Sequence, residues 1–458
     1  MVSTLDTARR RQTVRLGFLF GTLYLIQGIG EPTEGLIAQP VRSLLNTWGC
    51  SAAEIGIFAM LLSLPWAIKP LFGILTDFVP LWRRRRKSYL ILVNAAALSG
   101  LVVLYAAPPQ RGAVLWLLAL LLVPTFSVAF ADVVVDALMV EKGQPLGITG
   151  RLQSIQWACM YAATAVTGQL GGYLSETHRQ DLGFLICAAV MVPALFLSIF
   201  VVREKPCPSG LPSARTALRT LWRAARTPGV LAVGAFLFLW NFNPFSTAVL
   251  QHHMVNEMQL GEQFFGETVT IQAVASVVAS IAYGFYCRRL TLRTLVHLSI
   301  VLGILSTIGY WALVGRVSAM GVSVAVGFVY MTATLIQLDL AAQVCPPETA
   351  GTIFALLMSL SNLGLALSTG LGGLLYDQGT NWWGSRTLAF NVLVGIGAGF
   401  TAGCWFLVPW LLRKPRSGLD ERETAEEVRR LRTRGVVQKP RSTGASPDGG
   451  GTKTGPSV

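Results

Sequence analysis

Apolar stretches long enough to cross a membrane recur along most of this chain. We count twelve of them, at approximately 15–42, 51–72, 88–107, 112–138, 150–174, 182–202, 228–253, 264–286, 294–314, 318–342, 350–375 and 386–412. Hydrophobic residues make up 52% of the 458 positions and charged residues only 13%, a balance that excludes an ordinary soluble domain. The sequence therefore predicts an all-α integral membrane protein with twelve transmembrane helices.

A basic segment rich in Pro, Gly and Ser separates the sixth stretch from the seventh, at residues 203–227. This composition is typical of a linker, and its ARTALRTLWRAAR part predicts a short amphipathic helix on the membrane surface. We therefore expect two pseudo-symmetric six-helix bundles, at 15–202 and 228–412. A short N-terminus at 1–14 precedes them, and the polar composition of 413–458 predicts a largely disordered tail.

Glycine pairs occur at matched places in the two predicted bundles. Gly171-Gly172 lies near the end of the fifth stretch and Gly372-Gly373 near the end of the eleventh, 201 positions later. Small residues at such places let two helices pack closely in a membrane. Coincidence among 46 glycines is the alternative interpretation.

Positive charge falls on one side of the predicted topology. Most of the 37 lysines and arginines lie in the N-terminus, the RRRRK run at 83–87, the linker, the loop after the eighth stretch and the tail, which share that side. By the positive-inside rule this side, with both termini, is cytoplasmic. We expect a multi-pass protein of the plasma (inner) membrane, whose net charge of +14 serves the bilayer surface and not a nucleic acid.

The loop after the second stretch contains Gly73 and Asp77, followed by Arg83, Arg84, Arg85, Arg86 and Lys87. This order resembles the glycine-aspartate-basic signature of the major facilitator superfamily, with extra residues (FVPLW) between the aspartate and the basic run. The resemblance implies that these residues take part in a gate on the cytoplasmic side.

Five stretches resemble the folate-biopterin transporter family within that superfamily. They are LPWAIKPLFGILTDFVPLWRRRRKSYL (64–90), ADVVVDALMVE (131–141), GRLQSIQW (150–157), FLFLWNFNP (236–244) and CPPETAGTIFALLMSLSNLG (345–364). The resemblance implies twelve helices, alternating access and a folate- or pterin-like substrate. It also implies that the first, fourth, seventh and tenth helices line a central cavity.

Gln27, Glu31 and Glu34 recur at i, i+4 and i+7 on the first predicted helix and so share one face. Pro32 and Gly35 loosen the helix beside them and free backbone carbonyls, a pattern associated with binding sites in transporters. We interpret the three polar residues as substrate- or proton-binding. The alternative is that the helix surfaces early and that both glutamates lie in an outer loop.

Asp132 and Asp136 lie one turn apart on the fourth predicted helix, toward its cytoplasmic end. Carboxylates there oppose the helix dipole, so we expect cations nearby, namely Lys69 and the basic run. For Asp136 we favour a gate formed with Lys69 and the 83–87 run. For Asp132 a gate and a direct substrate contact remain open, because the amino and N–H groups of a pterin suit a carboxylate acceptor.

Aromatic and amide side chains supply the remaining candidates for substrate binding. A planar heterocycle stacks on aromatic rings and hydrogen-bonds at its edges. For the residues of the seventh helix, packing between helices is the alternative. The candidates are Gln156 and Trp157 on the fifth helix, Trp240, Asn241 and Asn243 beside Pro244 on the seventh, and Gln337 on the tenth.

These patterns predict a secondary active transporter and not an enzyme. The sequence contains no phosphate-binding loop and no metal-ligand spacing, so we expect no cofactor and no metal, and we expect coupling to an ion gradient. Protons are the first candidate, because a low dielectric favours the protonated form of a carboxyl group. Glu31→Gln is then expected to abolish pH-dependent uptake. The alternatives are a permease for another solute, such as a muropeptide, acyl-CoA or drug, and a non-transporting membrane receptor.

Overall fold

The structure is a computed structural model. It describes residues 2–204, 206, 219, 222–223, 225–286, 290–345 and 350–411. Most of the predicted linker, including most of its predicted amphipathic helix, lies outside the described residues, as does the whole predicted tail. We call residues 2–204 the N-half and residues 225–411 the C-half.

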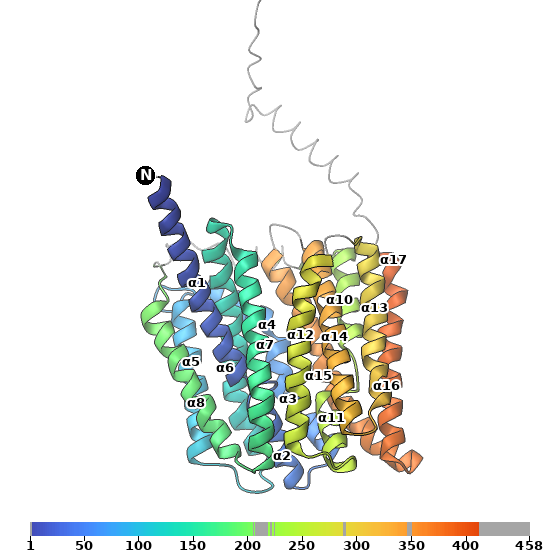
Figure 1. Cartoon of the computed structure of the whole chain (residues 1–458). Coiled ribbons are helices and arrows are strands. Elements are labelled where there is room, and N and C mark those ends of the chain that lie inside the picture. Colours follow the sequence, from blue (N-terminus) through green and yellow to red (C-terminus); the bar gives the residue numbers. More distant parts are fainter. Residues whose placement is uncertain are drawn as a thin grey trace, which may run out of the picture. The chain divides into compact units, whose positions relative to one another are not determined.

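The N-half consists of helices joined by short turns, and Figure 1 shows its long helices in blue to green. Their bounds are α1 (Val2–Gly30), α2 (Ala38–Thr47), α3 (Ala52–Ala67), α4 (Lys69–Phe78), α5 (Lys87–Ala106), α6 (Val114–Gly143), η1 (Gln144–Leu146), α7 (Thr149–Glu176), α8 (Gln180–Phe196) and η2 (Leu197–Val201).

The C-half is built in the same way, in yellow-green to red in Figure 1. Its elements are α10 (Pro228–Asn241), α11 (Thr247–His252), η3 (His253–Glu257), α12 (Glu262–Tyr286), α13 (Leu292–Ile308), η5 (Gly309–Ala312), α14 (Arg316–Val344), α15 (Ala350–Trp383), α16 (Arg386–Gly403), η7 (Cys404–Leu407) and α17 (Val408–Leu411).

Ten helices among the described residues are long and apolar enough to cross a membrane, which confirms the all-α membrane class. The two other predicted spans are also helical. The fifth is α7, which is 28 residues long but carries polar residues such as Gln153 and Gln156. The seventh is split into α10 and α11. The count of twelve spans therefore stays a prediction.

The first helix of each half breaks near its middle. In the N-half the chain leaves the helix at Gly30 and resumes it at Ala38, so the predicted span 15–42 is not continuous. Pro32 disfavours a helical conformation of Glu31, and Gly35 lies against the backbone of Glu31, where a side chain has no room. The predicted loosening by Pro32 and Gly35 is thus confirmed. In the C-half the equivalent break follows Asn241 and ends at Thr247.

Two names locate positions along the helices. The basic face is the membrane side where residues 78–87 and 143–149 join their helices. The far face is the opposite side, with residues 47–52 and 257–262.

The halves contact each other mainly through two helix pairs, α3 with α15 and α7 with α12. One glycine of each predicted pair lies in these crossings, while Gly171 and Gly372 pack on backbone within their own halves. Gly172 packs on the backbone of Gln263 and Gly266, and Gly373 packs on Ala52 and Ala53. Such contacts bring helix backbones together and gain dispersion energy that lipid tails cannot supply. The interpretation of the glycine pairs as packing sites is confirmed.

Candidate functional site

Lys69 and Asp132 form a buried ion pair inside the N-half. Lys69 Nζ on α4 lies 2.5 Å from Asp132 Oδ2 on α6, and the two side chains are only 15% and 8% exposed. Gln27 on α1 donates to the other carboxylate oxygen at 2.6 Å. The Lys69 ammonium also lies 4.3 Å from the centre of the Trp66 ring. Three helices are therefore tied together at Asp132.

Asp136 has different partners from those that the sequence predicted. Its Oδ1 accepts a hydrogen bond from the Tyr24 hydroxyl at 2.5 Å and one from the Gln156 amide at 3.2 Å. The expected contact with Lys69 goes instead to Asp132, one helical turn away, which corrects that part of the gate hypothesis. Tyr24 was missed, although its spacing of three residues from Gln27 places it on the same helix face.

Glu31 organises the break in the first helix. Its carboxylate accepts hydrogen bonds from the backbone N–H groups of Thr33 at 2.8 Å and Glu34 at 2.6 Å. The Thr33 hydroxyl donates at 2.6 Å and the Trp66 indole at 3.2 Å. The residue is only 4% exposed. These four donors stabilise a charged carboxylate where the helix has ended.

Glu34, three residues later, has fewer partners. Its side chain is exposed and makes no hydrogen bond among the described residues, while the Arg42 guanidinium on α2 interacts with it electrostatically. Arg42 Nε donates to Gln251 of the C-half at 2.6 Å. Arg42 is a functional candidate that sequence reasoning missed, although an arginine at the end of an apolar stretch was a usable signal.

Aromatic rings form one pair on α7 of the N-half and another between α10 and α14 of the C-half. Trp240 on α10 packs against Tyr330 on α14 with ring centres 5.5 Å apart. Trp157 stacks on Tyr161 on α7 with ring centres 6.0 Å apart. Tyr330 lies near Glu34, and the Tyr161 hydroxyl donates to Met331 Sδ, next to Tyr330 on α14, at 2.6 Å. Rings of the two halves therefore lie close to one another, as recognition of a planar solute requires.

Gln337 and Asn241 meet beside these rings. Asn241 donates to Gln337 Oε1 at 3.4 Å, and Gln337 Nε2 is buried without a hydrogen-bond partner among the described residues. Such an unsatisfied donor costs about 1–3 kcal/mol, which a bound acceptor can recover. Asn243 instead bonds Thr307 at 3.4 Å and the Phe245 backbone at 3.1 Å, inside the C-half, as the helix-packing alternative predicts.

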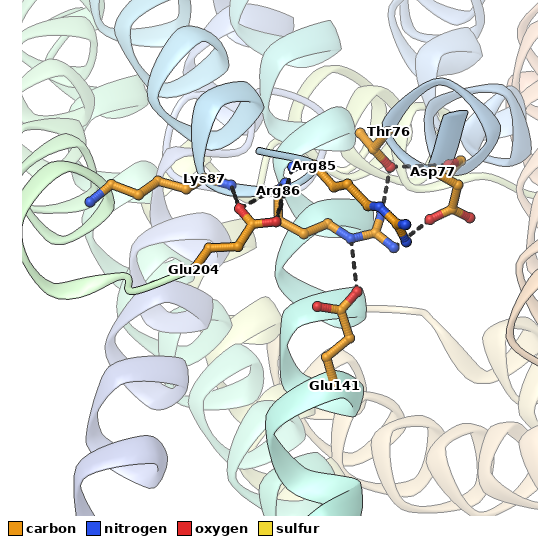
Figure 2. Close-up of polar contacts among 8 residues, drawn as sticks. Thr76, Asp77, Arg85, Arg86, Lys87, Glu141 and Glu204 are labelled. Atoms are coloured by element: carbon orange, nitrogen blue, oxygen red, sulfur yellow. Dashed lines mark hydrogen bonds and ion pairs between the residues drawn. The ribbon is translucent and has the colours of Figure 1, made fainter. Parts of the chain in front are cut away.

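Arg86 links the basic-face ends of α4 and α6, as Figure 2 shows. Its guanidinium donates to Asp77 and Thr76 at 2.5 Å and to Glu141 at 3.2 Å, and the residue is only 6% exposed. None of these bonds reaches Asp132 or Asp136. Among the described residues, the basic run is therefore not a direct partner of either aspartate. The predicted gate residue Gly73 lies one turn before Asp77 on α4.

Glu204 closes the same loop from the end of the N-half. Its carboxylate accepts the backbone N–H groups of Arg85 at 2.9 Å and Lys87 at 2.8 Å, and so caps the start of α5 (Figure 2). Arg83 is exposed in a left-handed backbone conformation, and Arg84 bonds Leu81 through its backbone N–H. Of the four predicted gate arginines, Arg86 is thus the buried, organising one.

Comparison with known proteins places this arrangement in a family. The model of the BT1 family matches residues 33–396. The chain belongs to the BT1 family. A protein of Synechocystis sp. named folate-biopterin transporter is 31% identical over 392 residues, which cover 81% of this chain and 76% of that protein. Probable folate-biopterin transporter 4 of Arabidopsis thaliana is 25% identical over 451 residues, covering 81% and 90%.

Solved structures agree on the fold of this BT1-family protein. The D-xylose-proton symporter aligns with a TM-score of 0.66 over 88% of this chain and 99% of that one, at 11% identity. The nucleoside transporter NupG aligns with a TM-score of 0.65 over 88% and 100%, at 14% identity. At these identities the similarity shows the fold alone, that of the major facilitator superfamily. The predicted family, fold and membrane-transporter class are confirmed.

Proposed function

We propose that this BT1-family protein is a secondary active transporter of a folate- or pterin-like solute, working by alternating access in the plasma membrane. The observation that carries the proposal is the buried Gln337 Nε2 group, which has no hydrogen-bond partner among the described residues and lies beside Asn241 and the Trp240–Tyr330 ring pair. The names of the relatives support the substrate class, since they are called folate-biopterin transporters.

The substrate in this proposal is a flat ring with donors and acceptors on its edge. Tyr330 and Gln337 are seven residues apart on α14 and so share a face. A pterin ring stacks beside Tyr330 and accepts the Gln337 N–H. The exposed Glu34 carboxylate receives the pterin amino and N–H groups, because a carboxylate accepts two parallel hydrogen bonds well. Arg42 receives the negatively charged tail that folate carries and free pterins lack.

Asp132 and Glu31 are less suited to direct substrate contact. Asp132 is occupied by Lys69 and Gln27, and Glu31 by four donors. Trp157, stacked on Tyr161 from the N-half, and Gln156, bonded to Asp136, complete the site on the α7 side. We assign to Asp132 and Asp136 a change of protonation or of hydrogen-bond partner during the transport cycle. Protons are the coupling ion in this proposal.

Contacts that join the halves at the far face support alternating access. Gln39 donates to Glu262 at 2.9 Å, Arg42 to Gln251 at 2.6 Å, and Asn46 to Asn256 at 2.8 Å. With the basic face cytoplasmic by the positive-inside rule, this is a state closed to the outside. The basic-face loop, held by Asp77 and Arg86, forms the opposite gate in this proposal.

Competition of labelled folate uptake tests the substrate class. Uptake of labelled folate is measured in cells that express the protein, in the presence of unlabelled pterins, peptides, nucleosides or acyl-CoA. We expect competition by pterins and folates alone. Competition by peptides or acyl-CoA but not by pterins would contradict the proposal and favour the alternative permease.

A further inference from the structure

Two carboxylates at the far face each cap a helix of the opposite half. Asp377, near the end of α15 in the C-half, accepts the backbone N–H of Ala53 at 2.7 Å. Ala53 lies in the first turn of α3 in the N-half. The first N–H groups of a helix lack partners within the helix, and its N-terminus carries a partial positive charge. From across the interface, Asp377 accepts one of these N–H groups and places a negative charge beside the positive end of α3.

Glu176 does the same in the reverse direction. It is the last residue of α7 in the N-half, and its Oε2 accepts the backbone N–H groups of Glu262 at 2.8 Å and Gln263 at 3.2 Å. These two residues open α12 in the C-half. The N-terminus of α12 is therefore capped by the other half.

The two caps are copies of one arrangement. Glu176 and Asp377 are separated by the same 201 positions as the repeated glycine pairs. Each carboxylate follows a packing glycine, Gly172 or Gly373, by one helical turn. Each of these glycines touches the backbone of the helix that its carboxylate caps. The same arrangement therefore occurs once in each direction across the interface between the halves.

We propose that Glu176 and Asp377 are positioning residues that hold the far side of the transport pathway shut. Both caps require the halves to meet at the far face, so each one is broken when this side opens. The proposal rests on the alternating access proposed above, and it identifies the contacts that set the balance between the two states. Gln39, Arg42 and Asn46 add side-chain contacts at the same interface, so loss of the caps shifts the balance without abolishing closure.

Glu54 provides a matched control on one of the same helices. Its carboxylate accepts the Ser51 backbone N–H at 2.8 Å, and the Ser51 hydroxyl accepts the Glu54 N–H in return. This capping box lies at the N-terminus of α3 but entirely within the N-half. Glu54→Gln therefore disturbs the same helix end without touching the contact between halves.

Distances between spin labels at the far face test the proposal without any substrate. Labels at exposed Gln110 in the N-half and exposed Thr387 in the C-half, in a variant without native cysteines, report their separation. Glu176→Gln and Asp377→Asn should each raise the ratio of open to closed far face on the order of fivefold, and the double variant should raise it further. Glu54→Gln should match the parent protein.

Conservative variants separate a positional role from general instability. Glu176→Asp and Asp377→Glu keep the charge and should restore part of the closed population that the amides lose. An unchanged distance distribution in both single amide variants, or the same shift in Glu54→Gln, would overturn the proposal. The label distances are measured without substrate. A shift of these distances in the amide variants, together with an absence of folate flux, would therefore support the role of the caps and overturn only the proposed substrate.

Discussion

Lys69 Nζ and Asp132 Oδ2 lie 2.5 Å apart between α4 and α6, with both side chains largely buried. Removing one member of such a pair leaves an uncompensated charge in a low dielectric, whereas removing both leaves none. The N-half should therefore tolerate the loss of both charges better than the loss of one.

Lys69→Met should lower the free energy of unfolding by about 3–5 kcal/mol, because Asp132 then stays buried without its cation. Lys69→Met combined with Asp132→Asn should regain much of the loss, since the new amide still accepts from Gln27. Thermal unfolding of the purified protein in detergent measures both variants. Equal stability of the single and the double variant would contradict the assignment of the ion pair.

Glu31 and Glu34 should behave differently when each is changed to glutamine. Glu31→Gln places an NH₂ group against backbone donors, so it should lower the melting temperature. Glu34→Gln removes no hydrogen bond seen among the described residues. It should keep the melting temperature and raise the KM for folate. A Glu34→Gln protein with unchanged KM would remove Glu34 from the substrate site.

Gln337→Met should separate stability from transport. The substitution conserves volume and removes Nε2, which has no hydrogen-bond partner among the described residues, so the free energy of unfolding should stay level or rise by about 1 kcal/mol. The KM for pterins should rise about tenfold, the loss of one hydrogen bond of about 1.4 kcal/mol. Unfolding curves and uptake kinetics on the same preparations decide the outcome. A stable variant with parental KM would show that Gln337 does not touch substrate.

Arg86→Lys should loosen the basic-face loop. The lysine ammonium cannot replace the guanidinium, which donates to Asp77, Thr76 and Glu141 together. We therefore expect the free energy of unfolding to fall by about 1.5–3 kcal/mol. Arg83→Lys is the matched control, because Arg83 is exposed in the same loop. Proteolysis of the loop should accelerate in Arg86→Lys alone. Equal cleavage of both variants would contradict the organising role of Arg86.

The sequence was informative where the cause is local. The break after Gly30 could be predicted because Pro32 and Gly35 act on their own helix, and the polar face of Gln27, Glu31 and Glu34 follows from helical periodicity. The partner of Lys69 could not be predicted. Asp132 and Asp136 differ by one helical turn, about 6 Å along the axis, and only the packed position of α4 against α6 decides between them.

Contacts between the halves were the least predictable part. The cap of Ala53 by Asp377 joins residues 324 positions apart. In the sequence, a single carboxylate near a helix end cannot be distinguished from an ordinary surface residue. Only the packed structure shows which helix it caps. The repeat of glycines at 201 positions was visible beforehand, but its meaning for Glu176 and Asp377 required the packed crossings.

Flux of labelled folate into proteoliposomes tests the central claim most directly. Purified protein should give saturable uptake that unlabelled pterins compete, that an inward proton gradient accelerates, and that Glu34→Gln weakens through KM. Uptake no greater than in protein-free liposomes, from a preparation that still binds folate, would contradict the account and indicate a receptor without transport.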